Sequence, residues 1–589
     1  MKGKPACGLS LLAAGIMLSG LVLSSCTRSE QAAPNVVLIV VDALRPDFLG
    51  CYGYGRPTSP NIDRIARRGV VFENAVAHAP WTKTSFSTFL TSLYPFQHGV
   101  VGWESVMPDS VLTLPEALRA AGYSTMAVIN MLGITGEFKV TRGVDKLSEA
   151  DKGERDAFGT SADAVELMKS APRPFFIMIH YFDTHRPYRV PAEYVDLVRK
   201  PGDPDPFSAQ SADGAREGER PPQEITDRER VLYGGCIRYV DDAVGNLLKY
   251  LDKAGLSRET IFILTADHGE AFWEHGAMAH GSNLYDEAIR VPLVIDYPRK
   301  YNRPQRVDAQ VRHIDLLPTI LELAGASDSR RREGTSLCPL IETGKRQAAP
   351  ARWLPQDAAL CECSLKKTPD SRCIRTNDLK LIVEPATALC ELYDLRSDPK
   401  ENVNLWGKGS AAADSFFRLL ARIPGTSLNG WRVALTGEPT GMVEVDVTLA
   451  RGSRVTGVHK VSAPGAMAVD VPADSTSLSI RARPRGLQVV LFDVEPKDAR
   501  VRFTVSTTGT DGPKAVNVGE IGARRIGERF DLGPRDATGL PDAFGLFRTQ
   551  RAAGVHIWWL PGDEMRKPGE RAVLPPEAKK RLRALGYIQ

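Results

Sequence analysis

The sequence lacks a strong excess of either charge, internal repeats, and any second long apolar run after its N-terminus. Its 75 basic and 71 acidic residues leave a net charge of only +4. This balance argues against a nucleic-acid-binding surface spread over the protein, although a local basic pocket for an anion stays open. A chain of 589 residues is too long for one core, so two or three domains are expected.

The N-terminus departs from this soluble composition. Lys2 and Lys4 precede a mostly apolar run over residues 8–23, and two serines then lead to Cys26. A secretory signal peptide is predicted by the basic start, the short apolar stretch and the small residues before a cleavage site. The Leu-Ser-Ser-Cys end resembles a bacterial lipobox, which implies a lipid anchor on Cys26. The alternative is an uncleaved anchor helix, but the run is short for a span of about 20 apolar residues. Both interpretations place the body outside the cytoplasm, in a bacterial cell envelope facing the periplasm or the exterior.

Seven cysteines remain beyond Cys7 and Cys26, and four of them fall between residues 361 and 390. In an oxidising compartment this density predicts one or two local disulfides, whose pairing the sequence does not reveal. A zinc cluster is disfavoured because the spacing lacks the paired cysteines of a usual zinc site.

Three apolar, β-branched runs each end in acids or histidines. Residues 36–41 lead into Asp42, residues 175–179 lead into His180 and His185, and residues 261–264 precede Asp267 and His268. Helical patterns lie between and after them, at residues 59–68, 114–121 and 239–254. This alternation predicts an α/β domain with a mainly parallel sheet covered on both faces. Ligands of such sheets bind beyond the carboxyl ends of the strands, where these polar residues fall.

The pattern changes along the chain and divides it into segments. Residues 201–222 are rich in proline, glycine and charge and indicate a surface insertion, and short alternating strands after residue 426 predict a separate all-β, sandwich-like domain. The predicted segments are a signal peptide at 1–26, a tether at 27–34, an α/β catalytic domain at 35–325, its C-terminal subdomain at 326–405, a linker at 406–425, a β-rich accessory domain at 426–560 and a helical tail at 561–589.

The residues themselves indicate a metal site beside a hydroxyl. Asp42, Asp267 and His268 can hold one divalent cation; oxygen ligands favour Mg, Ca or Mn, and the histidine widens the choice toward Zn. Thr82 directly precedes a helical stretch at residues 85–93, where unpaired backbone amides bind an anion and a coordinated hydroxyl becomes a nucleophile. On the residues alone, a plain helix N-cap is the favoured role for Thr82.

A set of motifs in the expected order over residues 35–405 resembles the sulfatase family of the alkaline phosphatase superfamily. The motifs are Val41-Asp42-Ala43-Leu44-Arg45-Pro46-Asp47, Thr58-Ser59-Pro60-Asn61-Ile62-Asp63, Thr91-Ser92-Leu93-Tyr94-Pro95, Asp267-His268-Gly269-Glu270, His280-Gly281, Arg290-Val291-Pro292-Leu293, His313-Ile314-Asp315 and Leu392-Tyr393-Asp394-Leu395. The resemblance implies a three-layer α/β sandwich of alkaline phosphatase/sulfatase type with a small α+β C-terminal subdomain. The β-rich segment that follows matches no family that we can name.

The resemblance also implies roles for individual residues. It makes Asp42, Asp267 and His268 metal ligands and places Thr82 at the nucleophile. His185 and His280 become groups that bind the transferred anion or protonate the leaving oxygen. His180 and Arg45 are weaker candidates for substrate binding.

Two departures from the family pattern qualify these roles. Sulfatases usually carry Cys-x-Pro-Ser-Arg at the nucleophile, where the cysteine becomes formylglycine, but here Thr82 replaces the cysteine and Phe86 the arginine. No formylglycine is therefore expected. The second metal-binding acid often found after the first is Ala43 here. A threonine with an Asp-His pair is similar to phosphoryl-transferring relatives such as lipoteichoic acid synthases and phosphoethanolamine transferases.

The sequence thus predicts a metal-dependent hydrolase of sulfate or phosphate esters. Its substrate would be an anionic ester, as a sulfated or phosphorylated glycan, lipid or small molecule, and no nucleic acid is expected as a partner. The alternatives are a phosphoglycerol- or phosphoethanolamine-type transferase, and a catalytically degenerate lipoprotein that binds glycans or lipids. A binding-only descendant has no reason to keep a nucleophile together with its metal ligands.

Overall fold

A computed structural model describes most of the chain from residue 32 to residue 560. The described residues are 32–150, 154–207, 220–328, 330, 332–346, 354–363, 371–384, 389–405, 430–436, 441–462, 467–483, 488–496, 498–508, 512–518, 522–537 and 554–560. The predicted signal peptide with Cys26, the linker at 406–425, the C-terminal tail and most of the predicted insertion lie outside them.

One large mixed sheet organises the first half of the chain. Within the described residues it has nine strands, and the order along its main path is β10-β2-β9-β6-β1-β5-β3-β4, with β11 also paired to β2. Strand β9 runs antiparallel to both β2 and β6, whereas the other pairings in the sheet are parallel. The strands are β1 (Asn35–Val41), β2 (Val70–Val76), β3 (Ser124–Ile129), β4 (Lys146–Glu149), β5 (Phe175–Tyr181), β6 (Thr260–Ala266), β9 (Arg290–Asp296), β10 (Gln305–Val307) and β11 (Val311–Arg312).

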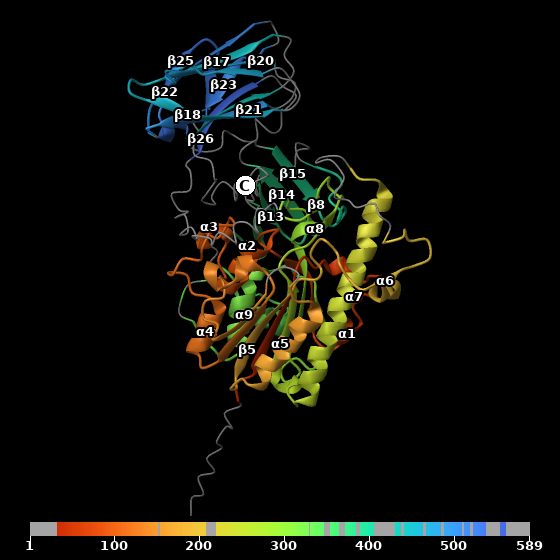
Figure 1. Ribbon diagram of the computed structural model, residues 1–589. Coiled ribbons are helices and arrows are strands. Elements are labelled where there is room, and N and C mark those ends of the chain that lie inside the picture. The colour runs from red at the N-terminus through yellow and green to blue at the C-terminus, as the bar shows by residue number, and fades with distance from the viewer. Residues whose placement is uncertain are drawn as a thin grey trace, which may run out of the picture. The chain divides into compact units, whose positions relative to one another are not determined.

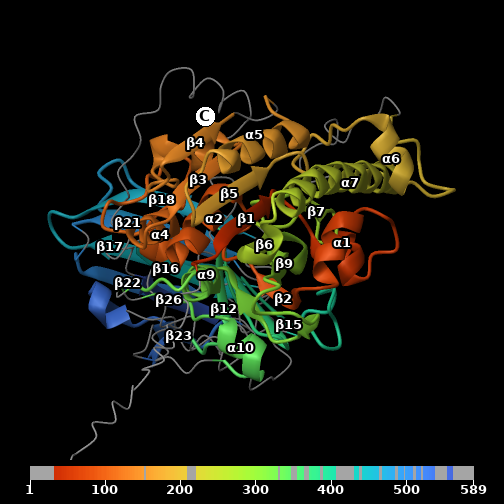
Figure 2. The ribbon, with the colours of Figure 1, turned by 90° about the horizontal axis from the view of Figure 1, so that it is seen from below.

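Helices cover both faces of this sheet and complete three layers (Figures 1 and 2). Helices α1, α5 and α7 pack together on one face, and α2, α4 and α9 pack together on the other. The helices of this region are α1 (Pro60–Ala66), α2 (Thr82–Thr91), α3 (Pro95–His98), α4 (Leu114–Ala120), α5 (Ala157–Lys169), α6 (Ala192–Val198), α7 (Gln223–Lys253), α8 (Asp286–Ile289), α9 (Leu316–Leu323) and α10 (Cys338–Thr343).

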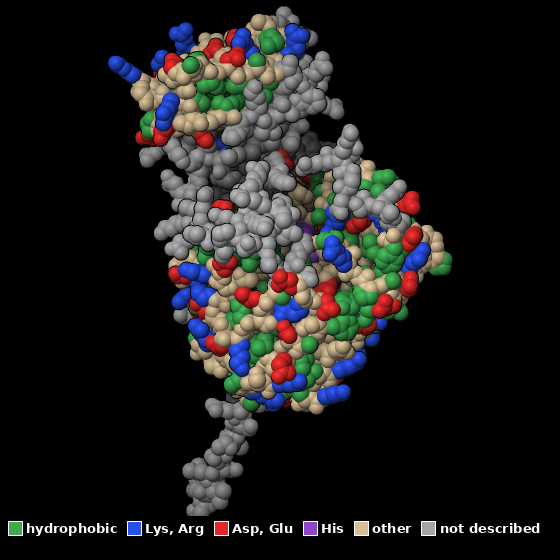
Figure 3. Space-filling model, viewed as in Figure 1, with side chains coloured by type: hydrophobic (Ala, Val, Ile, Leu, Met, Phe, Trp, Pro, Cys, Tyr) green, Lys and Arg blue, Asp and Glu red, His purple; other side chains and the backbone are tan. Residues whose placement is uncertain are grey.

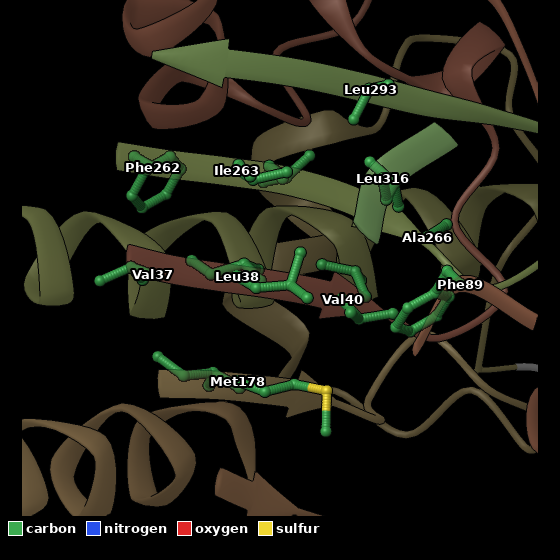
Figure 4. Packing of buried hydrophobic residues seen from close by; sticks show 14 of the residues in the cluster. Val37, Leu38, Val40, Phe89, Met178, Phe262, Ile263, Ala266, Leu293 and Leu316 are labelled. Carbon is green, nitrogen blue, oxygen red and sulfur yellow. The ribbon is translucent and has the colours of Figure 1, made fainter. Parts of the chain in front are cut away.

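The central strands form the core because neither of their faces meets water. Every residue of β1, β5 and β6 is buried, as the unbroken apolar runs predict for a sheet covered on both sides. Figure 4 shows Val37, Leu38 and Val40 of β1 among side chains from neighbouring strands and from α2 and α9. The outer surface, in contrast, carries interspersed basic and acidic side chains (Figure 3).

Two smaller β structures follow. Strands β12 (Ala359–Cys363), β13 (Ser371–Arg375), β14 (Leu379–Glu384) and β15 (Leu389–Asp394) form an antiparallel sheet in that order. Between residues 430 and 560 a six-stranded and a five-stranded sheet share one apolar core. Their strands are β16 (Gly430–Thr436), β17 (Val443–Leu449), β18 (Arg454–Ser462), β19 (Met467–Asp470), β20 (Ser477–Ala482), β21 (Gln488–Glu495), β22 (Val501–Thr507), β23 (Ala515–Val518), β24 (Gly522–Arg525), β25 (Arg529–Leu532) and β26 (Gly554–Leu560).

The α/β fold class and the β-rich C-terminal region are confirmed, but several local predictions need correction. The helix predicted at 239–254 begins at Gln223, because tertiary packing extends it through the Gly234-Gly235 pair that propensity disfavours. Thr82 is the first residue of α2 and only 3% exposed, not a loop residue before a helix. Cys361 and Cys373 lie opposite each other on β12 and β13 as free thiols, so the structure has no disulfide between them, and the Cys390 side chain lies outside the described residues. No helix among the described residues is long and apolar enough to cross a membrane.

Candidate active site

The candidate site lies at the carboxyl ends of β1 and β6. These two strands are parallel neighbours, with Val41 opposite Ala266, so the residues that follow them, Asp42 and Asp267, meet at one edge of the sheet. Both acids and the adjacent His268 are completely buried. Asp42 is also bonded to the neighbouring strand β5, because its backbone amide donates to Tyr181 O at 2.9 Å.

Asp42, Asp267 and His268 converge as a candidate metal site. Each residue offers one ligand atom, and these atoms lie within 4.8 Å of one another. Asp42 Oδ1 and Asp267 Oδ2 have no hydrogen-bond partner among the described residues, whereas Asp267 Oδ1 accepts from the amides of Ala43 at 3.0 Å and His268 at 2.9 Å. Two buried carboxylate oxygens without donors are unfavourable unless a cation satisfies them, so the set fits a divalent metal.

The electrostatics of the two acids support this fit. Burial raises the pKa of Asp267, and the negative charge of Asp42 raises it further. Burial also acts to raise the pKa of Asp42, but a hydrogen bond from His180 and the charges of His185 and His268 outweigh it and hold that pKa below its ordinary value. The acids therefore repel each other in a medium that water does not screen, and a bound cation would let both ionise.

His268 presents one ring nitrogen to the acids and the hydroxyl. Its Nδ1 lies 2.8 Å from Gly269 O, which fixes Nδ1–H as the donor and leaves the Nε2 lone pair free to bind a metal. Nε2 lies 3.3 Å from Asp267 Oδ2 and 3.2 Å from Thr82 Oγ1. Gly269 is required here, because a Cβ atom would lie 2.0 Å from Glu287 O.

Thr82 stands at the start of α2 and points at the acids. Its Oγ1 donates to Asp42 Oδ2 at 3.3 Å and lies 3.2 Å from His268 Nε2. Trp81 caps the helix in an extended conformation and uses no side-chain hydrogen bond. The amides of the first turn of a helix are unpaired within it, so they lie beside the Thr82 hydroxyl as donors for an anion.

His280 and His185 extend the site outward from His268. The ring centroids of His268 and His280 are 4.3 Å apart, and those of His280 and His185 are 4.8 Å apart. Phe182 stacks on His185 at 4.5 Å. Burial acts to lower the pKa of His280, but the charge of Glu270 and its hydrogen bond to Nδ1 at 3.3 Å raise it above the ordinary value. These contacts favour the protonated form of the His280 ring.

The two weaker candidates for substrate binding, His180 and Arg45, contact other charged residues in the structure, and their substrate role stays a prediction. His180 is completely buried, and its Nε2 lies 3.2 Å from Asp42 Oδ2, so it helps to position the Asp42 carboxylate. The Arg45 guanidinium donates to Asp47 at 2.7 and 2.9 Å and to Glu274 at 2.8 Å. With its donors engaged in this way, Arg45 supports the loop after β1, and its substrate role stays a prediction that these contacts do not favour.

The sequence analysis assigned no role to two buried ionisable residues near the site. Glu270 is completely buried and orients His280, and one of its oxygens has no partner among the described residues. Its presence in the Asp-His-Gly-Glu motif could have drawn attention to it.

Lys83 is also completely buried; Nζ donates to Trp103 O at 2.6 Å and lies 3.4 Å from the centroid of the Phe138 ring. No sequence signal separated Lys83 from an exposed helix lysine.

Comparisons with known proteins identify the family of this chain. A family model described as Sulfatase matches residues 34–326, and a model for the C-terminal part of N-sulphoglucosamine sulphohydrolase matches residues 274–419. The chain is 26% identical over 480 residues to the multifunctional alkaline phosphatase superfamily protein PehA of Trinickia caryophylli, covering 64% of this chain and 92% of the relative. It is 26% identical over 497 residues to an N-acetylglucosamine-6-O-sulfatase of Bacteroides thetaiotaomicron, covering 67% and 87%.

Solved structures show the same fold. The phosphonate monoester hydrolase of Agrobacterium radiobacter superposes with a TM-score of 0.54 at 20% identity, covering 66% of this chain and 95% of that one. A structure solved in complex with its substrate D-glucosamine-2-N,6-O-disulfate gives a TM-score of 0.56 at 21% identity, covering 66% and 97%. Members of the matched family use a divalent metal, in line with the cluster of Asp42, Asp267 and His268. The chain belongs to the sulfatase family, a family of hydrolases within the alkaline phosphatase superfamily.

Proposed function

We propose that this protein hydrolyses sulfate or phosphate esters by direct attack of Thr82. The observation that carries the proposal is the position of Thr82 Oγ1, which lies 3.3 Å from Asp42 Oδ2 and 3.2 Å from His268 Nε2. A plain N-cap hydroxyl would bond to the amides of its own helix, whereas Thr82 bonds to two members of a metal-binding set.

Asp42, Asp267 and His268 would hold one divalent metal ion. Their two carboxylates and one imidazole suit Ca, Mg or Mn, with Zn as a further candidate. When bound, the ion would favour the deprotonated hydroxyl and offset negative charge on the transferred group. No formylglycine is involved, because residue 82 is threonine.

The side chains of this protein supply the remaining steps. Asp42 Oδ2 accepts the hydrogen bond of the Thr82 hydroxyl and orients its oxygen for in-line attack on phosphorus or sulfur. The bond from that atom to the leaving oxygen breaks, and His280 or His185 gives the leaving oxygen a proton. The same histidine then takes a proton from the water that attacks the ester on Thr82. The Thr82 oxygen leaves in the deprotonated form in which it attacked, having given its proton to solvent before the first cycle, so the protons balance over each turnover.

The substrate is proposed as an anionic ester on a glycan, a lipid or a small molecule. Relatives named as sulfatases and structures named as phosphonate monoester hydrolases both match the chain, so sulfate and phosphate esters are both candidates. Direct attack by a threonine favours the phosphate ester. We further propose that the protein is exported and held in the bacterial cell envelope by a lipid on Cys26, on the basis of the N-terminal sequence.

The test is a substrate and metal panel with purified protein. Aryl sulfate, aryl phosphate and aryl phosphodiester would each be assayed after chelation and after reconstitution with Ca, Mg, Mn or Zn. The proposal expects metal-dependent turnover of at least one ester that releases the free anion. Transfer of the anion to an added alcohol in place of water would indicate a transferase. Tight glycan or lipid binding without turnover under any metal would indicate the degenerate binding protein.

A further inference from the structure

The segment that carries His280 is fastened to the C-terminal four-stranded sheet. This segment runs from His275 to Arg290 and includes α8. Close to the middle of it, the Sγ of Cys363 in β12 donates to Gly281 O at 3.1 Å, one residue after His280. The second family model spans residues 274–419 and so covers this segment and the sheet together.

The C-terminal side of the segment is held by a buried cluster of four charged residues. Asp286 accepts from Arg375 Nη2 at 2.7 Å and from Lys380 Nζ at 3.0 Å. Lys380 also contacts Glu401 Oε1 at 2.8 Å. The backbone amide of Asp286 donates to the other oxygen of Glu401 at 2.7 Å. Two cations and two anions thus neutralise one another around the first residue of α8.

Lys380 is the member of the cluster most dependent on its partners. Its side chain is 0% exposed, and that of Glu401 is 1% exposed. Burial acts to lower the pKa of Lys380, but the charges of Asp286 and Glu401 raise it above the ordinary value, so the ammonium stays charged. Burial raises the pKa of Glu401 to about 7 even with Lys380 beside it. Removing the ammonium would leave Asp286 and Glu401 without their shared cation, so that the two carboxyl groups separate or Glu401 takes a proton, and in both cases the ionic contact that holds Asp286 is lost.

The N-terminal side of the segment joins the same cluster. His275 Nε2 lies 3.1 Å from Glu401 O, and Nδ1 lies 2.8 Å from Glu287 Oε1. The ring of His275 stacks on that of Tyr285 with centroids 3.7 Å apart. His275 and Asp286, which lie on either side of His280, therefore both contact Glu401, and the cluster links the two sides of the stretch.

We propose that Lys380 is a positioning residue for the reaction, acting through Asp286 and Glu401 to hold His280 beside His268. The inference rests on the proposed function, in which His280 protonates the leaving oxygen. Among the described residues no hydrogen bond or ion pair joins the cluster to Asp42, Asp267 or His268, so its effect would pass through the backbone on both sides of His280. A shift of about 1 Å in such a group is enough to lower a rate by about a hundredfold.

The test compares Lys380→Met with a matched control in the same sheet region, Arg396→Met. Arg396 pairs with Asp378 at the surface, with side chains 72% and 42% exposed. Full-length variants loaded with metal would be assayed on two esters with the same transferred anion, one with an acidic phenol and one with an alkyl alcohol as leaving group. We expect Lys380→Met to lower kcat about tenfold or more on the alkyl ester and much less on the aryl ester, with KM little changed. Arg396→Met should match the parent on both.

A second measurement does not depend on turnover. Modification of His280 by diethyl pyrocarbonate, followed by peptide mass, should be faster in Lys380→Met and unchanged in Arg396→Met, and Lys380→Arg should restore the slow rate. Failure of the parent to cleave any ester would contradict the proposed function and leave this readout intact. An equal loss on both esters, matched by loss of folded protein, together with an unchanged modification rate, would overturn the positioning role.

Discussion

The α/β region and the β-rich region differ in where their charged side chains lie. At the carboxyl ends of β1 and β6, acids are completely buried and oxygens of Asp42 and Asp267 have no hydrogen-bond partner among the described residues. Between residues 430 and 560, charged side chains pair across strands at the surface. Arg502 contacts Asp531 at 2.8 Å with side chains 56% and 47% exposed, and Arg454 contacts Glu495 at 2.8 Å with 67% and 59% exposed.

The buried acids and the exposed ion pairs have different effects on the free energy of unfolding. Surface ion pairs contribute little to stability, because water already solvates both partners. Unpaired buried carboxylates reduce stability, and they persist where another ligand completes them. The chemistry of this protein is therefore assigned to the sheet edge in the α/β region, where two acids, a histidine and a hydroxyl converge. In the β-rich region the buried charged side chain of Arg432 on β16 is a cation and belongs to no such set of acids among the described residues.

The sharpest way to break the contrast is to remove one buried acid. Asp267→Ala should abolish turnover and most of the bound metal, because a hard cation loses charge and geometry together. Activity and metal stoichiometry, the latter by elemental analysis, are the measurements. Asp531→Ala in the β-rich region is the matched control and should keep both. If Asp267→Ala keeps full activity with unchanged metal, Asp267 is not part of the site.

Removal of the proposed acid should have the next largest effect. His280→Gln should lower kcat by about 10²–10⁴-fold on an ester with a poor leaving group, the usual range for general acid catalysis. An ester with an acidic phenol should lose far less, because it needs no proton to depart. The ratio of the two rate constants is the measurement. An unchanged ratio would assign the acid role to another residue, with His185 as the first candidate.

A pH measurement tests whether a buried histidine affects the stability of the β-rich region. His556 is 3% exposed, and burial lowers its pKa to about 4. Because the unfolded chain binds this proton near pH 6.5 and the folded chain near pH 4, stability is fully present above pH 6.5 and falls as the pH drops toward 4. The contribution lost by pH 5 is about 2 kcal/mol.

Hydrogen exchange of β26 peptides in the full-length chain measures this effect. Protection should fall from pH 7 to pH 5 after correction for intrinsic exchange. His556→Gln should show a smaller fall, because its amide side chain does not titrate. Equal falls in parent and variant would show that another group is responsible.

The smallest expected effect comes from the surface of the β-rich region. Arg502→Ala removes the exposed pair with Asp531 and should leave turnover, metal content and the unfolding midpoint unchanged. A clear loss of activity on a polymeric substrate, with normal activity on an aryl ester, would instead indicate that this surface contacts substrate.

Much of the fold could be predicted because the apolar runs at 36–41, 175–179 and 261–264 are unambiguous buried strands. The acids after them could be predicted as one site for the same reason, since parallel strands end at one edge. The antiparallel course of β9 could not, because its apolar run reads the same in either direction. The start of α7 was missed because packing overrides the local preference of its glycine pair.

The sequence indicates which residues are candidates for the site but not the contacts that each of them makes. His180 and Arg45 fall in the right segments, yet their partners, Asp42 and Asp47, are set by side-chain directions that no spacing rule gives. Glu270 shows the reverse case. It follows a predicted ligand directly, but only the fold of the hairpin between residues 271 and 279 brings it to His280.

Direct attack by Thr82 is the central claim, and a covalent adduct tests it most directly. Parent protein would be mixed with its best substrate, quenched in acid and digested, and the peptide containing Thr82 weighed. The account predicts unmodified threonine before substrate and a phosphoryl or sulfonyl group on Thr82 after the quench. Thr82→Ser should keep part of the turnover, whereas Thr82→Ala should fall toward the roughly 10³–10⁴-fold residual acceleration that other hydrolases retain without a nucleophile. A Thr82→Ala variant that forms no adduct and turns over at the parental rate would contradict the account.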